Sequence, residues 1–110
     1  MQKTSLTALA RHELEAASRA PSGRSGRTIY GGHEHQLRQT LIALRAGHAL
    51  GEYENPGEAT VLVVVGRVIV RCGEDSWSGW NSDLIILPSA SHRIEAVEDS
   101  VVLLTVVKER

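Results

Sequence analysis

The sequence contains one cysteine, three prolines and no phenylalanine, and its large aromatic residues are two tryptophans and two tyrosines. Because Cys72 is the sole thiol, it cannot form an internal disulfide or a zinc site of several thiolates, and we expect a reduced, cytoplasmic protein. No apolar run approaches the roughly 18 residues of a membrane span, so no membrane partner is expected. A net charge of −1 argues against a nucleic-acid partner, although Arg19, Arg24 and Arg27 form a small basic cluster.

The N-terminal part of the 110-residue chain has the pattern of one short helix followed by a connector. Between residues 6 and 18, apolar or small residues recur every three or four positions, and Thr4 or Ser5 can serve as the N-cap. The apolar face is mostly alanine, which predicts packing on a neighbouring surface of this chain or of a second subunit. Proline, serine and glycine at 21–26 predict a flexible connector. We therefore assign residues 1–27 to the helix and connector and 28–110 to a β domain.

The β domain is predicted from short segments rich in β-branched residues, separated by Gly, Pro, Asn and Asp turns. No helical pattern of roughly 10 to 15 residues lies between them, which argues against a parallel α/β sheet. The predicted strands are Leu37–Leu44, Thr60–Val65, Arg67–Cys72, Leu84–Leu87, Ser91–Ala96 and Val101–Val107. The sequence therefore predicts an all-β antiparallel barrel or sandwich with a short N-terminal α-helix.

Two segments of the β domain resemble the two motifs of the cupin superfamily. They are residues 47–66, GHALGEYENPGEATVLVVVG, and residues 79–96, GWNSDLIILPSASHRIEA. Asp83 matches the aspartate of the motif turn, Pro88 the strand-ending proline and His92 the motif histidine, whereas Ser82 replaces the usual glycine. The similarity to small single-domain cupins extends over about residues 37–107. It implies a cupin-type double-stranded β-helix, or jelly-roll barrel, and commonly a homodimer.

The resemblance also bears on metal binding. Cupins that hold a metal use a His-x-His pair and a Glu from the first motif together with the histidine of the second. In this sequence Tyr53 and Asn55 stand at the two histidine positions and Ala59 at the glutamate position, and His92 alone is retained. Alanine cannot ligate a metal and a neutral amide is a weak ligand. A standard four-ligand site is therefore not expected, and the cofactor is either none or a divalent transition metal in an irregular site.

Other residues could supply such an irregular site. Glu52, Glu54 and Glu58 lie close to the vacant positions and offer carboxylate oxygens, or they form a solvated acidic rim. His33 and His35 form a His-x-His pair whose side chains would share one strand face, roughly 6.5 to 7 Å apart, if this segment were extended. The alternative is a surface loop with two solvated imidazoles. The candidate metal ligands are thus His92, His33 and His35, none of them firmly assigned.

The few bulky residues also bear on the barrel interior. A small barrel encloses either packed side chains or one ligand cavity. Valine, leucine and isoleucine can leave room for a modest pocket with Tyr53, Asn55 and His92 at its polar end, and Trp80 is a further candidate for ligand contact. His92 is the candidate general acid or base, because imidazole titrates near neutrality. The alternative is a hydrogen-bonded structural histidine.

Three classes of function remain open. The first is a cupin-fold protein that binds a small organic ligand in its barrel without a standard metal site. The second is an enzyme of isomerase or oxygenase type that uses His92, with or without a metal. The third is a regulatory or interaction module, although the sequence shows no helix-turn-helix pattern. We favour the first class, with a small-molecule ligand and a second copy of the chain as partners.

Overall fold

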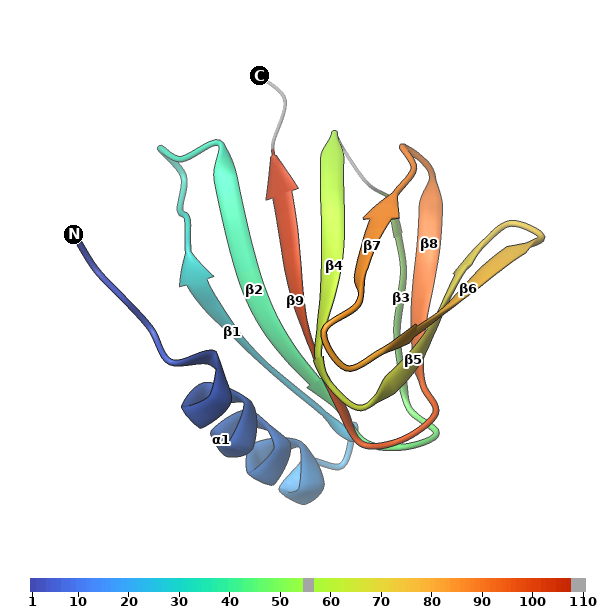
Figure 1. Cartoon of the computed structure of the whole chain (residues 1–110), viewed down its shortest axis with the longest axis horizontal. Coiled ribbons are helices and arrows are strands. Elements are labelled where there is room, and N and C mark those ends of the chain that lie inside the picture. Colours follow the sequence, from blue (N-terminus) through green and yellow to red (C-terminus); the bar gives the residue numbers. More distant parts are fainter. Residues whose placement is uncertain (55–56, 108–110) are drawn as a thin grey trace.

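The computed structural model describes residues 1–54 and 57–107, and it contains one helix and two antiparallel sheets (Figure 1). The elements in chain order are α1 Leu6–Arg19, β1 Arg24–Tyr30, β2 Leu37–Leu44, β3 Ala49–Glu54, β4 Glu58–Val65, β5 Arg67–Cys72, β6 Asp75–Trp80, β7 Leu84–Leu87, β8 Ser91–Ala96 and β9 Ser100–Val107. The predicted all-β class with a short N-terminal helix is confirmed. The described helix is neither long nor apolar enough to cross a membrane.

The two sheets face each other as the layers of a sandwich. One sheet has five strands in the order β1-β2-β9-β4-β7, and the other has four in the order β3-β8-β5-β6. Strands far apart in sequence are neighbours: Ala43 pairs with Val101 across β2 and β9, and Val68 pairs with Ala96 across β5 and β8. Figure 1 shows the helix on the far side of the five-stranded sheet, away from the four-stranded one.

The main core lies between the sheets and follows from the period-two alternation of the strands. In β8 the residues alternate between exposed and buried positions, so that His92, Ile94 and Ala96 face inward. The same alternation buries valines of β4 and β5. The buried apolar residues of this core are Ile42, Leu44, Ala59, Val61, Val63, Val68, Val70, Leu87, Ile94, Ala96, Val102 and Leu104. The core is therefore almost entirely aliphatic, as the lack of phenylalanine requires.

Helix α1 covers the outer face of the five-stranded sheet. Its first turn is capped by Ser5, whose hydroxyl accepts a hydrogen bond from the Ala8 amide at 3.2 Å. Ala10, Glu13 and Ala17 are buried, and the helix packs against the second face of β2 and β9. The alanine-faced helix thus packs on a surface of its own chain.

The predicted connector is wrong over residues 24–26. Gly23, with a φ of +69°, ends the turn after the helix, and β1 begins at Arg24, so the boundary that we placed after residue 27 lies inside this strand. Gly26 pairs with Ile42 of β2. β1 tolerates serine, glycine and arginine because it is an edge strand with a largely exposed surface. Backbone pairing holds it in place, together with the contacts of Ser25 and Arg27 with the buried Glu13.

Candidate functional site

The candidate site is centred on His92, the second residue of β8. Its side chain is fully buried (0% exposed) and lies on the interior face of the strand with Ile94 and Ala96. The backbone of His92 pairs with that of Tyr53 in β3, next to the loop that connects β7 and β8. The resemblance predicted an inward-facing histidine at this position, and the burial of His92 agrees with that prediction.

The proton of the imidazole ring can be assigned from its neighbour. Nδ1 of His92 lies 3.4 Å from the carbonyl oxygen of Ala90, and a carbonyl can only accept a hydrogen bond, so Nδ1 carries the proton in this contact. In the neutral ring Nε2, which is also buried, then carries the lone pair. Burial lowers the pKa of His92, and the Ala90 carbonyl offsets part of that decrease. His92 is therefore a neutral imidazole near neutral pH.

Two other polar residues are buried in the described part of the chain, and both are engaged in holding the fold. Glu13 accepts a hydrogen bond from the Ser25 hydroxyl at 2.6 Å and lies 3.5 Å from Arg27. The Ser100 hydroxyl accepts from the Arg67 amide at 3.0 Å and donates to the Glu98 carbonyl at 2.7 Å. Neither residue combines burial with the acid–base chemistry of imidazole at neutral pH, which distinguishes His92.

The His-x-His pair lies in the turn between β1 and β2 and not on a strand. Gly31, with a φ of +114°, ends the extended segment, and the amide of His35 donates to the Gly32 carbonyl at 3.1 Å. His33 is exposed, while the ring of His35 packs edge-on against Tyr30, with centroids 4.9 Å apart. Of the two alternatives, the pair on one strand face does not occur, and the segment is a turn, which the two glycines allow.

Metal-ligating side chains do not gather within residues 1–54 and 57–107. Nowhere in these ranges do three His, Cys, Asp or Glu side chains come together in a way that could hold a metal ion. His33 and His35 thus form no such group with His92. Glu52 and Glu58 are exposed, as the acidic-rim alternative predicted, and nothing is described of the Glu54 side chain. Asn55 lies outside the described residues, and for Tyr53 the structure describes the backbone alone.

Trp80 lies on the outer face of the four-stranded sheet. Its strand neighbour Gly79 is buried and Trp80 is 50% exposed, so the two face opposite sides of β6. The Arg67 guanidinium lies 5.6 Å from the Trp80 ring centroid, a cation–π contact. Trp80 pairs with Arg67 at the start of β5, whereas His92 adjoins Arg93, which pairs with Arg71 near the end of β5. That register separates Trp80 from His92 by roughly 15 Å along the sheet, so the structure does not bring them together.

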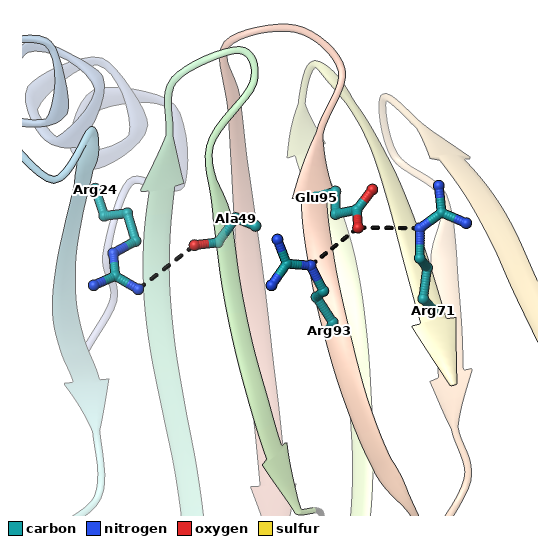
Figure 2. A network of polar contacts seen from close by, with 5 residues as sticks. All are labelled: Arg24, Ala49, Arg71, Arg93 and Glu95. Carbon is teal, nitrogen blue, oxygen red and sulfur yellow. Dashed lines mark hydrogen bonds and ion pairs between the residues drawn. The ribbon is translucent and has the colours of Figure 1, made fainter. Parts of the chain in front are cut away.

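Sequence reasoning missed a polar network on the same outer face (Figure 2). Oε2 of Glu95 accepts from Nε of Arg71 and from Nε of Arg93, both at 3.0 Å, and these contacts lower the pKa of Glu95. At the adjoining edge the Arg24 guanidinium donates to the Ala49 carbonyl at 3.5 Å. The alternation in RVIVRC and SHRIEA could have revealed the network, because it places Arg71, Arg93 and Glu95 on the face opposite to His92.

The second motif forms a turn whose polar residues serve the fold. The Asp83 carboxylate accepts from the Trp80 amide at 2.8 Å, and the Asn81 side chain accepts from the Gly66 amide at 2.6 Å. Ser82, which replaces the usual glycine, adopts a φ of +70°. This turn joins β6 to β7 and so connects the two sheets.

Comparison with known proteins gives a fold and no activity. No protein-family model matches the sequence, and no curated protein matches it significantly. A solved protein from Thermus thermophilus superposes with a TM-score of 0.76 and 21% identity, over 99% of this chain and 100% of that one. A conserved protein of unknown function from Streptococcus pyogenes superposes with a TM-score of 0.73 and 25% identity, over 83% of this chain and 79% of that one. A cupin superfamily protein from Desulfitobacterium hafniense superposes with a TM-score of 0.72 and 14% identity, over 78% of each chain. The likeness shows a shared fold.

Proposed function

We propose that this small cupin-fold protein binds a small organic ligand inside its barrel, with His92 as the polar group that the ligand meets. The fold itself is that of the cupin superfamily proteins. The observation that carries the proposal is the full burial of His92 on the interior face of β8, at the end of an otherwise aliphatic core. Burying an imidazole among valines and leucines costs free energy, which a ligand-binding role would justify.

The state of the imidazole narrows the chemistry of the ligand. With Nδ1 directed at the Ala90 carbonyl, Nε2 has the character of a hydrogen-bond acceptor. A neutral ring carries no charge to attract an anion, so the proposal favours a ligand that brings a hydroxyl, an amide or another neutral donor. The aliphatic walls favour a ligand with an apolar part.

A second candidate is an enzyme that uses His92 as a general base. The lowered pKa of His92 keeps the ring unprotonated near neutral pH, the form in which an imidazole accepts a proton. This isomerase-like alternative needs no metal. A metal-dependent reaction of oxygenase type would need further ligands, and the described residues bring no such group together. The ligand-binding proposal is preferred because it needs only the one polar residue.

Two measurements on untagged protein test the proposal. A panel of small alcohols and amides that each carry an apolar part is screened by thermal unfolding, where a ligand at about 100 times its Kd raises Tm by on the order of 10 °C. The rise is expected for the wild type and for the control His33→Ala, and not for His92→Leu. Metal analysis runs in parallel, because one equivalent of a transition metal that is lost in His92→Leu would overturn the metal-free proposal. A compound that shifts wild type and His92→Leu equally would show that His92 does not meet the ligand.

A further inference from the structure

The outer face of the four-stranded sheet concentrates positive charge. The outward positions of β5, β8 and β6 follow from the alternation of the first two strands and from their register with the third. They are Arg67, Ile69, Arg71, Ser91, Arg93, Glu95, Ser76, Ser78 and Trp80. Three arginines and one glutamate leave these positions with two positive charges, in a chain whose net charge is −1. We call the surface of Arg67, Ile69, Arg71, Arg93 and Trp80 the arginine face.

Two of these arginines are placed directly opposite each other. Arg71 of β5 pairs with Arg93 of β8 in the register of the sheet, and like charges at opposed positions destabilise a sheet. The Glu95 carboxylate lies between the two side chains (Figure 2) and balances one of the two charges. One positive charge at this point is left uncompensated, at a cost that a role in binding an anion would justify.

The arginine face already binds a carboxylate within its own chain and retains donors for another. Oε2 of Glu95 accepts from Nε of both arginines at 3.0 Å. Within residues 1–54 and 57–107 no partner is described for the Nη groups of Arg71 or Arg93, and their side chains are 49% and 44% exposed. A guanidinium group can donate five hydrogen bonds and favours carboxylates and phosphates. The outer edges of both groups are therefore available to a second anion.

Along β5 the arginine face has a period that matches an extended chain. Arg67, Ile69 and Arg71 alternate with buried valines, which places Ile69 halfway between two guanidinium groups that are attached roughly 13 Å apart. Ile69 belongs to neither hydrophobic core. Trp80, 50% exposed, extends the apolar surface beside Arg67. Extended chains pack on sheets with nearly aligned directions, so a partner segment along β5 would present its own alternate residues to these three side chains.

We propose that the arginine face binds an acidic segment of a partner protein in extended conformation, with the pattern acidic-x-apolar-x-acidic. The first and last residues of the pattern meet Arg71 and Arg67 in either direction, and the apolar residue meets Ile69. Arg93 strengthens the contact at Arg71. The proposal goes beyond a ligand in the barrel, because the arginine face is on the side of the sheet opposite to His92.

The observations favour a protein segment over a nucleic acid. Glu95 provides a carboxylate bound in place by these same guanidinium groups. An isoleucine at the centre of the face suits an aliphatic side chain, and tryptophan and arginine are the residues enriched at the energetic centres of protein interfaces. A long phosphate backbone would in addition be repelled by the net negative charge of the whole chain.

Fluorescence anisotropy with labelled peptides and the untagged full chain tests the pattern. The probe carries the core Glu-Ser-Leu-Ser-Glu behind a Gly-Ser-Gly spacer, at low salt. The two control peptides have the cores Glu-Glu-Leu-Ser-Ser, of the same composition, and Gln-Ser-Leu-Ser-Gln, without charge. We expect the probe to bind at least about fivefold more tightly than either control. Equal binding of the two acidic peptides overturns the proposed pattern, and tighter binding of a short oligothymidylate than of the probe overturns the choice of a protein partner.

Variants test the residues. Arg71→Gln is expected to weaken binding of the probe about tenfold. Arg11→Gln changes the net charge equally on an exposed position of α1, across the molecule, and should change the affinity less than about twofold. Equal affinities in Arg71→Gln and the wild type overturn the proposal. Should Arg71→Gln fail to fold by circular dichroism, Arg93→Gln takes its place.

Glu95 supplies a change in the opposite direction. Glu95→Gln removes the carboxylate that competes for the two guanidinium groups, so it is expected to tighten binding of the probe severalfold. Glu15→Gln on α1 is the matched control, because it removes the same charge from an exposed ion pair with Arg19 and should leave the affinity nearly unchanged. Glu95→Gln binding that is no tighter than that of the wild type would overturn the role given to Arg71 and Arg93.

Discussion

The two ends of the barrel use their polar residues differently. At the lower end in Figure 1, where the turns at 45–48, 66 and 97–99 lie, side chains close the turns by short hydrogen bonds to the backbone. The Asp99 carboxylate accepts from the Ala46 amide at 2.8 Å, and Ser100 joins β9 to β5. At the upper end, His92 lies 3.4 Å from the Ala90 carbonyl and the Ser89 hydroxyl donates to the Gly57 carbonyl at 3.3 Å, the side-chain contacts that the described residues show there.

We interpret the difference as one between residues that hold the fold and His92, the residue proposed to meet a ligand. Hydrogen bonds between side chain and backbone at the lower end fix the turns that bring the two sheets together. His92 occupies an apolar interior, where burial of its polar ring carries a cost. If the comparison is right, lower-end substitutions reduce stability strongly, and substitution of His92 reduces it little. The predictions below test this in order of decreasing effect.

Gly66→Ala should give the largest loss of stability. Gly66 has a φ of +99°, and a Cβ there would collide with Ser100 and with the backbone of Asp99. Left-handed strain and forced displacement of β9 together predict a decrease of about 3 kcal/mol in the free energy of unfolding. Urea unfolding measures it. Gly73→Ala is the control, because Gly73 also has a positive φ, +61°, but has nothing within 4 Å of its Cβ position. Equal losses in the two variants would contradict the role assigned to the lower end.

Ser100→Ala should cost about 1 to 3 kcal/mol. The substitution leaves the Arg67 amide without the part-buried hydroxyl that accepts its hydrogen bond at 3.0 Å, and an amide that loses its partner carries a desolvation cost to the extent that it is shielded from water. Urea unfolding again reports the loss. Ser89→Ala, which removes a 3.3 Å bond at the upper end, is the control and should change stability by less than about 1 kcal/mol. A larger loss of stability for Ser89→Ala than for Ser100→Ala would show that the upper-end contact holds the fold more strongly than the lower-end one.

The strands that the sequence predicted correctly are those in which the pattern of apolar and polar side chains shows which residues are buried. Leu84–Leu87 and Ser91–Ala96 have the predicted bounds, because alternation and β-branched residues determine them. β1, β3 and β6 were missed, since their sequences RSGRTIY, ALGEYE and DSWSGW are polar or rich in glycine. These three are edge strands, which pair on one side through backbone groups that leave little trace in the pattern of side chains.

The candidate site was predictable in part for a similar reason. The motif singled out His92 and put it at the polar end of a possible pocket, and the alternation of β8 explains its interior position. The outward position of Trp80 depends on the register of β5 and β6, in which Cys72 pairs with Asp75 across a tight turn at Gly73 and Glu74. A register shift of one residue would have turned Trp80 inward, and the sequence alone gives no means of deciding between the two.

His92→Leu should change the free energy of unfolding at pH 7 by less than about 1 kcal/mol in either direction. The substitution replaces a buried polar ring by an aliphatic side chain of similar size, which removes the desolvation cost of the ring together with its polar contacts, the long one to the Ala90 carbonyl among them. The measurement is the same urea titration that is used for Ser100→Ala. A loss as large as that of Ser100→Ala would make His92 a structural residue and remove the main support for a ligand site.

The pH dependence of stability should distinguish His92 from Glu95. Burial lowers the pKa of His92 in the folded state below its value of about 6.5 in the unfolded chain, so protonation favours unfolding. The contribution of His92 is therefore fully present above pH 6.5 and decreases as the pH falls toward the folded pKa. The pKa of Glu95 is lowered by Arg71 and Arg93. Glu95 therefore loses its contribution to stability only below the pH range in which a carboxyl group ordinarily titrates. Tm measured from pH 7.5 to pH 5 should thus decline more in the wild type than in His92→Leu, with Glu95→Gln following the wild type through this window. Parallel curves for the wild type and His92→Leu would show that the imidazole is not held neutral by its burial.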